Sequence, residues 1–265
     1  MKVMSYNSLF GGFDGDDARR HHLQIQAIRE VGPDVLLFQE AKHYDRDGGQ
    51  RLYEAERAFG MRGLLALAPH TGQNTGVFLR QGIELLSFEQ DGTHFHHAAT
   101  IVRARVPGFE PPITFVSVHL CPLSPHVRLT EVSHLFQLAA PDRLTLVGGD
   151  FNSVSPHDSE PSDWATLPAH HRSRYLSPDG RSADRRVLHA LYQAGYVDVA
   201  HRLGAHEAPT VPGAAFQNTE FIPFRSDYFL ASHALAERAI HYAVIKNSLT
   251  DAGSDHYPIL AEFRP

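Results

Sequence analysis

Eight side chains in the sequence belong to the types that bind divalent metal ions and transfer protons, and each lies where a short apolar run begins or ends. They are Asn7, Glu40, His119, Asp150, Asn152, Asp227, Asp255 and His256. Carboxylate and amide oxygens are ligands for hard cations, and imidazoles act as general acids and bases. If these groups meet in the folded chain, they form one polar crevice suited to such chemistry.

Each of these residues alone has an ordinary structural interpretation. Asn7 is typical of a turn, Glu40 of a solvated strand end, and His119 of a hydrogen-bonded core histidine. The two glycines before Asp150 predict that the backbone turns tightly there. Independent turn residues have no reason to follow one another in this order at successive strand ends. The combination therefore indicates a functional site.

The elements that must position these side chains are short strands and a few helices. Apolar residues at helical spacing predict helices over residues 16–31, 125–139 and 184–194. Interleaved strands and helices indicate an α/β layered fold. If the last strands run antiparallel to the earlier ones, their first residues share an edge with the earlier strand ends. Short β-rich runs predict strands over residues 3–6, 34–39, 75–80, 100–106, 113–120, 144–150, 227–232, 241–246 and 257–263.

We predict one domain over residues 1–265, with a long loop at about residues 153–183 that is rich in Pro, Ser and His. A loop of this length inside a compact domain is usually functional or disordered. A second loop, at roughly residues 204–224, carries several Pro and Gly residues. Neither loop is typical of an interdomain linker, because candidate site residues lie on both sides of each.

Composition narrows the classes of function. Lys and Arg number 24 against 30 Asp and Glu, so the net charge is −6 with His neutral. This sign does not favour holding nucleic acid by bulk charge, but a bound metal ion supplies local positive charge, so nucleic acid stays open as a partner. Cys121 is the single cysteine, which excludes an intrachain disulfide. Without an apolar leader or a membrane-length apolar run, we expect a soluble cytoplasmic protein with no membrane anchor and no evident obligate protein partner.

Six motifs resemble those of the endonuclease/exonuclease/phosphatase superfamily, and they occur in the family's order over nearly the whole chain. They are VMSYN (3–7), LLFQEAK (36–42), VSVHL (116–120), GGDFN (148–152), RSDYFLAS (225–232) and SDHYP (254–258). GDFN and SDHxP are each moderately specific, and the ordered set is highly specific. The resemblance implies a four-layer α-β-β-α sandwich of two packed mixed sheets flanked by helices, which agrees with the elements above.

The resemblance also implies a metal site. Glu40, with Asn7 and Asp255 nearby, is similar to the family's Mg²⁺ site, and hard oxygen ligands suit that ion. We expect Mn²⁺ to substitute for Mg²⁺. The bound ion polarises a phosphoryl oxygen and offsets negative charge that develops during the reaction.

The catalytic roles follow from the same resemblance. His256 is similar to the catalytic histidine, held by Asp227, whose carboxylate fixes its tautomer and raises its pKa. Asp150 is similar to the group that orients or deprotonates the attacking water, and the sequence leaves open which group is formally the base. Asn152 and His119 are expected to donate hydrogen bonds to the phosphate.

The expected activity is Mg²⁺-dependent hydrolysis of a phosphate ester by direct attack of an activated water, on a phosphodiester of nucleic acid or on a small phosphorylated metabolite. SVHLCP stands where apurinic endonucleases carry a Tyr-x-Pro-Asn segment, which argues against that subgroup. Ser226 replaces the apolar residue common before the Asp of the RxDY motif, and we locate no carboxylate that supports His119. The alternative is an inactive scaffold of the same fold that binds a phosphorylated partner.

Weaker patterns have competing interpretations. Arg172 and Arg174, with Trp164 upstream, indicate either a phosphate-contacting, base-stacking loop or a solvated basic loop. The spacing of Cys121 and Arg128 lacks the glycine-rich cradle of cysteine phosphatases, so we interpret Cys121 as a packed thiol. Histidine pairs at 21–22, 96–97 and 170–171 have no recognised zinc spacing.

Overall fold

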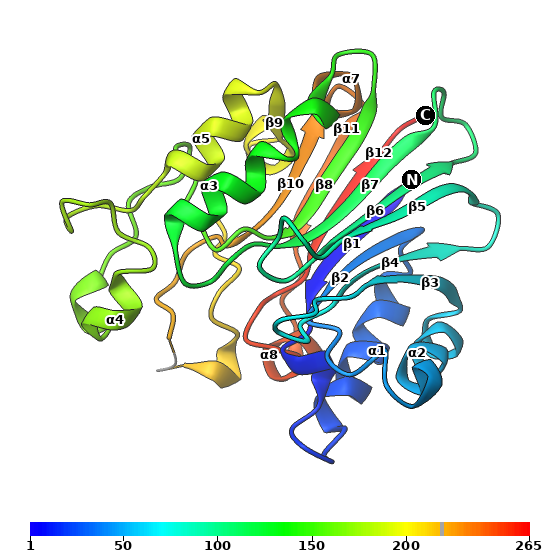
Figure 1. Cartoon of the computed structure of the whole chain (residues 1–265), viewed down its shortest axis with the longest axis horizontal. Helices are drawn as coiled ribbons and strands as arrows, with labels where there is room; N and C mark the ends of the chain where they lie inside the picture. The colour runs from blue at the N-terminus through cyan, green and yellow to red at the C-terminus, as the bar shows by residue number, and fades with distance from the viewer. Residues whose placement is uncertain (218–219) are drawn as a thin grey trace.

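The computed structural model describes residues 1–217 and 220–265 and consists of two six-stranded mixed sheets packed face to face (Figure 1). The first sheet runs, from edge to edge, β11 (Ala239–Val244), β12 (Ile259–Phe263), β1 (Lys2–Asn7), β2 (Val35–Gln39), β4 (Thr75–Arg80) and β3 (Met61–Ala66). The second runs β5 (Glu84–Asp91), β6 (Ala99–Arg105), β7 (Ile113–His119), β8 (Leu144–Asp150), β10 (Asp227–Ser232) and β9 (Tyr196–Asp198).

Helices cover the outer faces of both sheets. The α-helices are α1 (Arg19–Val31), α2 (Gln50–Phe59), α3 (Pro125–Ser133), α4 (Ala169–Arg172), α5 (Arg186–Gln193), α6 (Val199–Arg202), α7 (His233–Ala236) and α8 (Ser248–Gly253). Short 3-10 turns are η1 (Phe10–Gly12), η2 (Asp47–Gly49), η3 (Phe136–Ala139), η4 (Trp164–Thr166) and η5 (Ala214–Phe216). Of the helices in the described ranges, none is both long and apolar enough to span a membrane.

Three apolar clusters hold the layers together. Between the sheets, Leu37 on β2 packs in one core with Phe115 on β7 and Phe229 on β10, all with no exposed surface. Outside the first sheet, a second cluster joins α1 and α2 to β1 and β2. Outside the second, a third joins α3 and α5 to β7 and β8. The four-layer α/β sandwich implied by the sequence is thus confirmed, because each sheet buries one face on the other and one on helices.

Strand direction and register bring the polar strand ends together. β1 runs parallel to β2, and β7 runs parallel to β8, with His119 opposite Asp150. β10 runs antiparallel to β8 with Asp227 opposite Asp150, and β12 runs antiparallel to β1. The ends of four strands and the beginnings of two others therefore meet at one end of the sandwich, as the conditional prediction required.

Three local predictions were wrong. The helix predicted over residues 125–139 ends at Ser133 and is followed by the separate 3-10 turn η3. The first helix begins at Arg19, not at residue 16, because the Asp17 carboxylate instead accepts a hydrogen bond from the Arg19 backbone N–H at 2.9 Å. Gly148 and Gly149 lie inside strand β8 and not in a turn after it. A side-chain carbon on Gly149, whose φ is +145°, would lie 1.9 Å from the Val118 carbonyl oxygen, so glycine here permits close strand pairing.

The long loop at about residues 153–183, hereafter the insertion, contains η4 and α4 and lies at one side of the second sheet (Figure 1). Trp164 and Tyr175 in this segment pack with Phe224 in a small apolar cluster separate from the main core. The insertion is therefore a segment with its own packing, held against the residue 210–224 loop.

Candidate active site

Asp150, the last residue of β8, is the most heavily contacted carboxylate at the polar end of the sandwich. Its Oδ1 accepts hydrogen bonds from the Asn152 backbone N–H (2.9 Å) and the Ser226 hydroxyl (2.7 Å). Its Oδ2 accepts from the side-chain amides of Asn7 (3.2 Å) and Asn152 (3.3 Å). Burial alone would raise the pKa of Asp150, but nearby His256 and the hydrogen bonds outweigh it and lower the pKa. Asp150 is therefore held as a carboxylate in a fixed orientation.

His256 lies between two carboxylates. Its Nδ1 is 2.8 Å from Oδ2 of Asp227, and its Nε2 is 3.6 Å from Oδ2 of Asp150. All three side chains are almost fully buried. Burial opposes the charge on His256, but Asp227 and Asp150 outweigh it and raise the pKa of His256 well above its ordinary value. The arrangement favours an imidazolium with its Nε2–H directed toward Asp150.

Asp227 is itself held by a threonine from the residue 210–224 loop. The Thr210 hydroxyl oxygen accepts hydrogen bonds from the backbone N–H groups of Ser226 (2.9 Å) and Asp227 (3.1 Å). Burial raises the pKa of Asp227, and its contacts with His256 oppose that rise. The start of β10 is thereby fixed relative to the imidazole that it holds.

His119 approaches Asp150 from β7. Its Nε2 lies 3.4 Å from Oδ2 of Asp150, while its Nδ1 is 4.0 Å from Oε1 of Glu40, too far for a hydrogen bond. Within the described residues that Nδ1 has no hydrogen-bond partner. The ring instead packs 4.2 Å from the ring of His97, whose Nδ1 contacts the Thr71 hydroxyl at 2.8 Å. Burial lowers the pKa of His119, which favours a neutral imidazole.

Glu40 and Asp255 are two buried carboxylates that form no ion pair with a lysine or arginine within residues 1–217 and 220–265. Burial raises the pKa of Glu40, and it raises the pKa of Asp255 to about 6, with the Glu40 charge adding to the effect. Oε2 of Glu40 accepts from the Phe10 backbone N–H at 2.9 Å, and Ser254 donates to Oδ1 of Asp255 at 3.3 Å. Two such carboxylates beside the Asn7 amide fit a divalent cation, whose charge would offset their repulsion.

Backbone strain coincides with the polar end. Glu40 has a φ of 58° and Asn152 a φ of 48°, both in the left-handed region that non-glycine residues seldom adopt. Such strain persists only where the surroundings over-determine it, and it is common at functional sites. Both strained residues, Glu40 and Asn152, direct their side chains toward the other polar groups at this end of the sandwich.

A second set of atoms also has the spacing of a metal site. Asp150, Asp227 and His256 offer ligand atoms that all lie within 4.8 Å of one another. In this set, however, the 2.8 Å contact joins His256 to Asp227, and a metal there would have to replace it. The oxygen-rich Glu40, Asp255 and Asn7 set matches the preference of Mg²⁺ better, since Mg²⁺ favours hard oxygen ligands.

The eight residues singled out in the sequence thus lie at one end of the sandwich.

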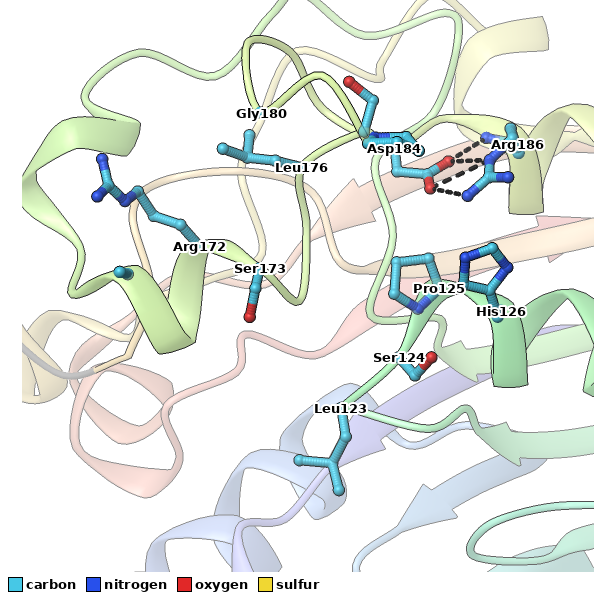
Figure 2. A pocket seen from close by; sticks show the side chains of 13 residues that line it. Leu123, Ser124, Pro125, His126, Arg172, Ser173, Leu176, Gly180, Asp184 and Arg186 are labelled. Atoms are coloured by element: carbon cyan, nitrogen blue, oxygen red, sulfur yellow. Dashed lines mark hydrogen bonds and ion pairs between the residues drawn. The ribbon is translucent and has the colours of Figure 1, made fainter.

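The two arginines of the insertion have different surroundings. Arg174 pairs with Glu220, while Arg172 lines a pocket between the start of α3 and the insertion (Figure 2). The next residue after Glu220, Phe221, packs its ring 5.4 Å from that of His256. The insertion is therefore tied to the polar end of the sandwich through residues 220–221.

The suggestion that Trp164 stacks on a base is wrong for this structure. Trp164 is 9% exposed, and its ring stacks on the Tyr175 ring with 6.0 Å between centroids. Its indole N–H donates to Glu160 at 2.9 Å. The side chain is thus used for packing inside the insertion and presents no free face to a ligand.

The other weak patterns are structural. Cys121 is a buried free thiol, as interpreted from the sequence, and its backbone carbonyl accepts a hydrogen bond from Nη1 of Arg128 at 2.8 Å. The other end of the Arg128 guanidinium donates to the Arg174 carbonyl at 2.6 Å, which attaches the insertion to α3. Within residues 1–217 and 220–265, the histidine pairs contribute to no cluster with metal-binding spacing.

Three residues contact the site although the sequence analysis did not predict that they would. Ser226, Thr210 and His97 each contact one of the residues that it singled out. Ser226 was visible only as a departure from the usual apolar residue, and its hydroxyl now has a clear partner in Asp150. His97 was visible only as a member of a histidine pair, and Thr210 comes from a loop without a motif, so the contacts of both with the site depend on tertiary structure.

The fold is a two-sheet α/β sandwich, and carboxylates, amides and imidazoles gather at its strand ends. These two features place the protein among layered α/β proteins with a polar site at one edge of the sheets. The model of the endonuclease/exonuclease/phosphatase family matches residues 4–256, and the chain belongs to this family of metal-dependent phosphoesterases. The match confirms the resemblance seen in the motifs.

Solved structures show the same fold. A functionally unknown conserved protein from Enterococcus faecalis V583 is 16% identical with a TM-score of 0.71, and the match covers 100% of this chain and 99% of that one. An AP endonuclease from Archaeoglobus fulgidus is 20% identical (TM-score 0.68; 99% of both chains). The mannosyl-6-phosphatase Bt3783 from Bacteroides thetaiotaomicron VPI-5482 is 15% identical (TM-score 0.69; 100% and 99%). No curated protein matches the chain significantly.

Proposed function

We propose that this protein is a Mg²⁺-dependent phosphoesterase that hydrolyses a phosphate ester by direct attack of an activated water. The observation that supports this most strongly is the placement of His256, 2.8 Å from Asp227 and 3.6 Å from Asp150, beside the buried carboxylates of Glu40 and Asp255. The substrate class is a phosphodiester of nucleic acid or a small phosphorylated metabolite.

The residues divide into two groups: those that would hold the metal ion and those that would act on the water and the phosphate. Glu40, Asp255 and Asn7 would hold Mg²⁺, which when bound supplies positive charge to the phosphoryl oxygens. Asp150, whose pKa is lowered, stays ionised and is suited to orient the attacking water and accept its proton. His256, whose pKa is raised, is suited to donate a hydrogen bond to the phosphate from Nε2.

The contacts of Asn152 favour a positioning role. Its side-chain N–H₂ donates to the Leu120 carbonyl at 3.0 Å and to Oδ2 of Asp150 at 3.3 Å, so both hydrogens are used within the protein. Donation to the phosphate would require one of these bonds to be released. His119, whose Nε2 faces the same oxygen of Asp150, is the better placed of the two to reach a bound phosphate.

The scaffold alternative has less support. A scaffold that has lost catalysis has no need to keep buried carboxylates and imidazoles, because each costs desolvation energy. Here the whole set is present, with Asp150, Asp227 and His256 oriented by hydrogen bonds. Strain at Glu40 and Asn152 is a further cost that an unused site would not keep.

The test is hydrolysis of bis-p-nitrophenyl phosphate, p-nitrophenyl phosphate, plasmid DNA, a single-stranded oligonucleotide and sugar phosphates, with Mg²⁺, with Mn²⁺ and with EDTA. Each assay is repeated with His256→Ala. We expect metal-dependent turnover of at least one substrate and its loss in the variant, and the preferred substrate names the branch. Activity that persists in EDTA and in His256→Ala would show that the catalytic end has been assigned wrongly. A folded protein inactive on every substrate would favour the scaffold alternative.

A further inference from the structure

His97 packs against His119 from the segment between β5 and β6. Ala99 at the start of β6 pairs with Val118 near the end of β7, so the two histidines come from adjacent strand ends. Their ring centroids are 4.2 Å apart with 34° between the ring planes, which places the two rings in contact. His97 is 5% exposed and His119 is 4% exposed, so the contact is buried.

A threonine from the loop between β3 and β4 tethers the ring of His97. Oγ1 of Thr71 lies 2.8 Å from Nδ1 of His97, and it also accepts a hydrogen bond from the Gln73 backbone N–H at 3.2 Å. Burial lowers the pKa of His97, and the neighbouring His119 adds to this effect, so the ring is neutral. Two neutral rings stack without charge repulsion, and the tether at Thr71 limits the rotation of His97.

The contact between the two rings is not a hydrogen bond. Nδ1 of His119 and Nε2 of His97 are both buried, and neither has a hydrogen-bond partner within residues 1–217 and 220–265. Oε1 of Glu40, which belongs to the proposed metal set, is 4.0 Å from Nδ1 of His119 and therefore does not orient the ring by a hydrogen bond. Ring contact, and not hydrogen bonding at Nδ1, orients this imidazole.

The two imidazoles that face Asp150 are thus supported in different ways. His256 has a carboxylate, since its Nδ1 is 2.8 Å from Oδ2 of Asp227. A carboxylate is the usual support for a histidine that transfers protons, because it fixes the tautomer and stabilises the protonated ring. His119 has a neutral aromatic ring as its neighbour, which restricts the plane of the imidazole but does not stabilise a positive charge on it.

We infer that His97 is a positioning residue for His119, and that stacking of its tethered ring keeps Nε2 of His119 directed toward Asp150 and the phosphate that would bind beside it. This rests on the proposed phosphoesterase function and adds a residue that the six motifs do not contain. Nε2 of His119 is 3.4 Å from Oδ2 of Asp150, so a small rotation of the ring would move it off its target. A misplacement of about 1 Å at a reacting group can cost about 100-fold in rate.

The kinetic test separates the ring face of His97 from its hydrogen-bonding nitrogen. His97→Phe keeps an aromatic face and loses the bond to Thr71, whereas His97→Gln keeps a polar group and loses the face. We expect His97→Gln to lower kcat by about 10-fold on the preferred substrate of the panel, and His97→Phe to stay within about 3-fold of wild type. The matched control is His94→Gln, which should change nothing. His94 belongs to the same segment and stacks on His134 at the same 4.2 Å, but both of these rings are exposed.

A second comparison shows whether His97 acts through His119. His97→Gln introduced into His119→Ala should cause no further loss, because the ring that it positions is gone. A purely structural role would instead lower the activity of His119→Ala by the same factor of about 10, and that result would overturn the inference. An equal loss in His97→Phe and His97→Gln would also overturn it, since the ring face would then not matter. Circular dichroism and the Mg²⁺-induced rise in Tm should be the same in all His97 variants and wild type.

Nitrogen-15 spectra of the imidazole rings test the same contact without any substrate. The His119 signals are assigned by their absence in His119→Ala. We expect sharp His119 ring signals in wild type, His97→Phe and His94→Gln, and signals broadened by exchange between ring orientations in His97→Gln. Equally sharp signals in His97→Gln would overturn the inference. If the signals broaden as expected but the wild type hydrolyses no substrate of the panel, the positioning role stands and the proposed function fails.

Discussion

The proposed catalytic end, which is the polar end of the sandwich around Asp150 and His256, and the insertion are built in opposite ways. At the catalytic end, the side chains sit on strand termini whose positions are set by sheet register, as with Asp227 opposite Asp150. The insertion has only a short 3-10 turn and a four-residue helix, packed around Trp164 and Tyr175. Two large sheets set the geometry of the catalytic end, whereas a few local contacts set the geometry of the insertion.

Under the proposed function, we expect this difference to separate the residues that carry out the chemistry from those that select the substrate. Displacing any strand at the catalytic end by one residue would turn its side chains to the other face, so the reactive groups tolerate little change. Changes in the insertion leave both sheets intact, and loops on a rigid scaffold commonly carry specificity. Substitutions at the catalytic end should therefore affect every substrate, while those in the insertion should affect some.

The largest effect is expected for Asp150→Asn. The substitution keeps the size of the side chain but removes the charge that lies beside both His119 and His256. We expect kcat to fall by about 1,000-fold on every substrate of the panel, the middle of the range for loss of a general base. Circular dichroism must show that the variant is folded. Activity above a tenth of the wild-type value on any substrate would break the proposed division of roles.

The next effect concerns the metal and pH. Because the pKa of Asp255 is raised to about 6, its carboxyl takes up a proton as pH falls through that value and then competes with the metal. The rise in Tm caused by Mg²⁺ should be steady above pH 7, and apparent affinity should fall by about 10-fold per unit below pH 6. Asp255→Asn should remove most of the Mg²⁺-induced rise. An equal rise at pH 5 and pH 8 would contradict the placement of the ion.

A smaller effect is expected for Ser226→Ala. The variant removes the 2.7 Å hydrogen bond to Oδ1 of Asp150 while leaving the Asn152 backbone contact in place. Loss of a bond to a charged group should lower kcat by about 10-fold with little change in KM. Ser226→Thr, which keeps the hydroxyl, should recover most of the loss. If KM rises and kcat does not fall, Ser226 serves substrate binding and not the orientation of Asp150.

The smallest effect on chemistry is expected for Trp164→Ala. Removing this ring leaves a void beside Tyr175 and Phe224 and should loosen the insertion locally, because the cluster is separate from the main core. Proteolysis within residues 153–183 should become faster, while turnover of bis-p-nitrophenyl phosphate stays within about 3-fold of wild type. A collapse of turnover on that compact substrate would show that the two regions are not independent.

Elements with strong apolar patterns were predictable from the sequence, and elements with few buried residues were not. β2 and β8 are buried at every position, so their apolar runs are unmistakable. β5 has no buried residue and so lacks the periodicity that burial imposes, and α2 is only ten residues long and fully buries only Ala55. β3 contains Gly63, where a side-chain carbon would lie 2.7 Å from Leu52 and Phe78, and its glycine weakened the strand pattern.

Site residues inside strand-end motifs were predictable from the sequence, and site residues in loops were not. Asp150 and His256 stand at strand edges inside specific motifs, so their convergence followed from strand directions. Thr210 lies in a loop, and its contact with the start of β10 depends on a bridge between residues 211 and 224. Arg174 pairs with Glu220, whereas the Arg172 guanidinium has no such pair among the described residues, and no local sequence pattern encodes this difference.

The pairing of β1 with β12 has a consequence for biosynthesis. Asn7 and Glu40 emerge from the ribosome early, but Asp255 and His256 belong to the segment that enters β12, more than 200 residues later. At about 5–20 residues per second, the early strands wait roughly 10–40 s for that partner. A nascent chain therefore has no complete catalytic end, and β1 presents an unpaired edge that other chains or chaperones can occupy until translation is finished.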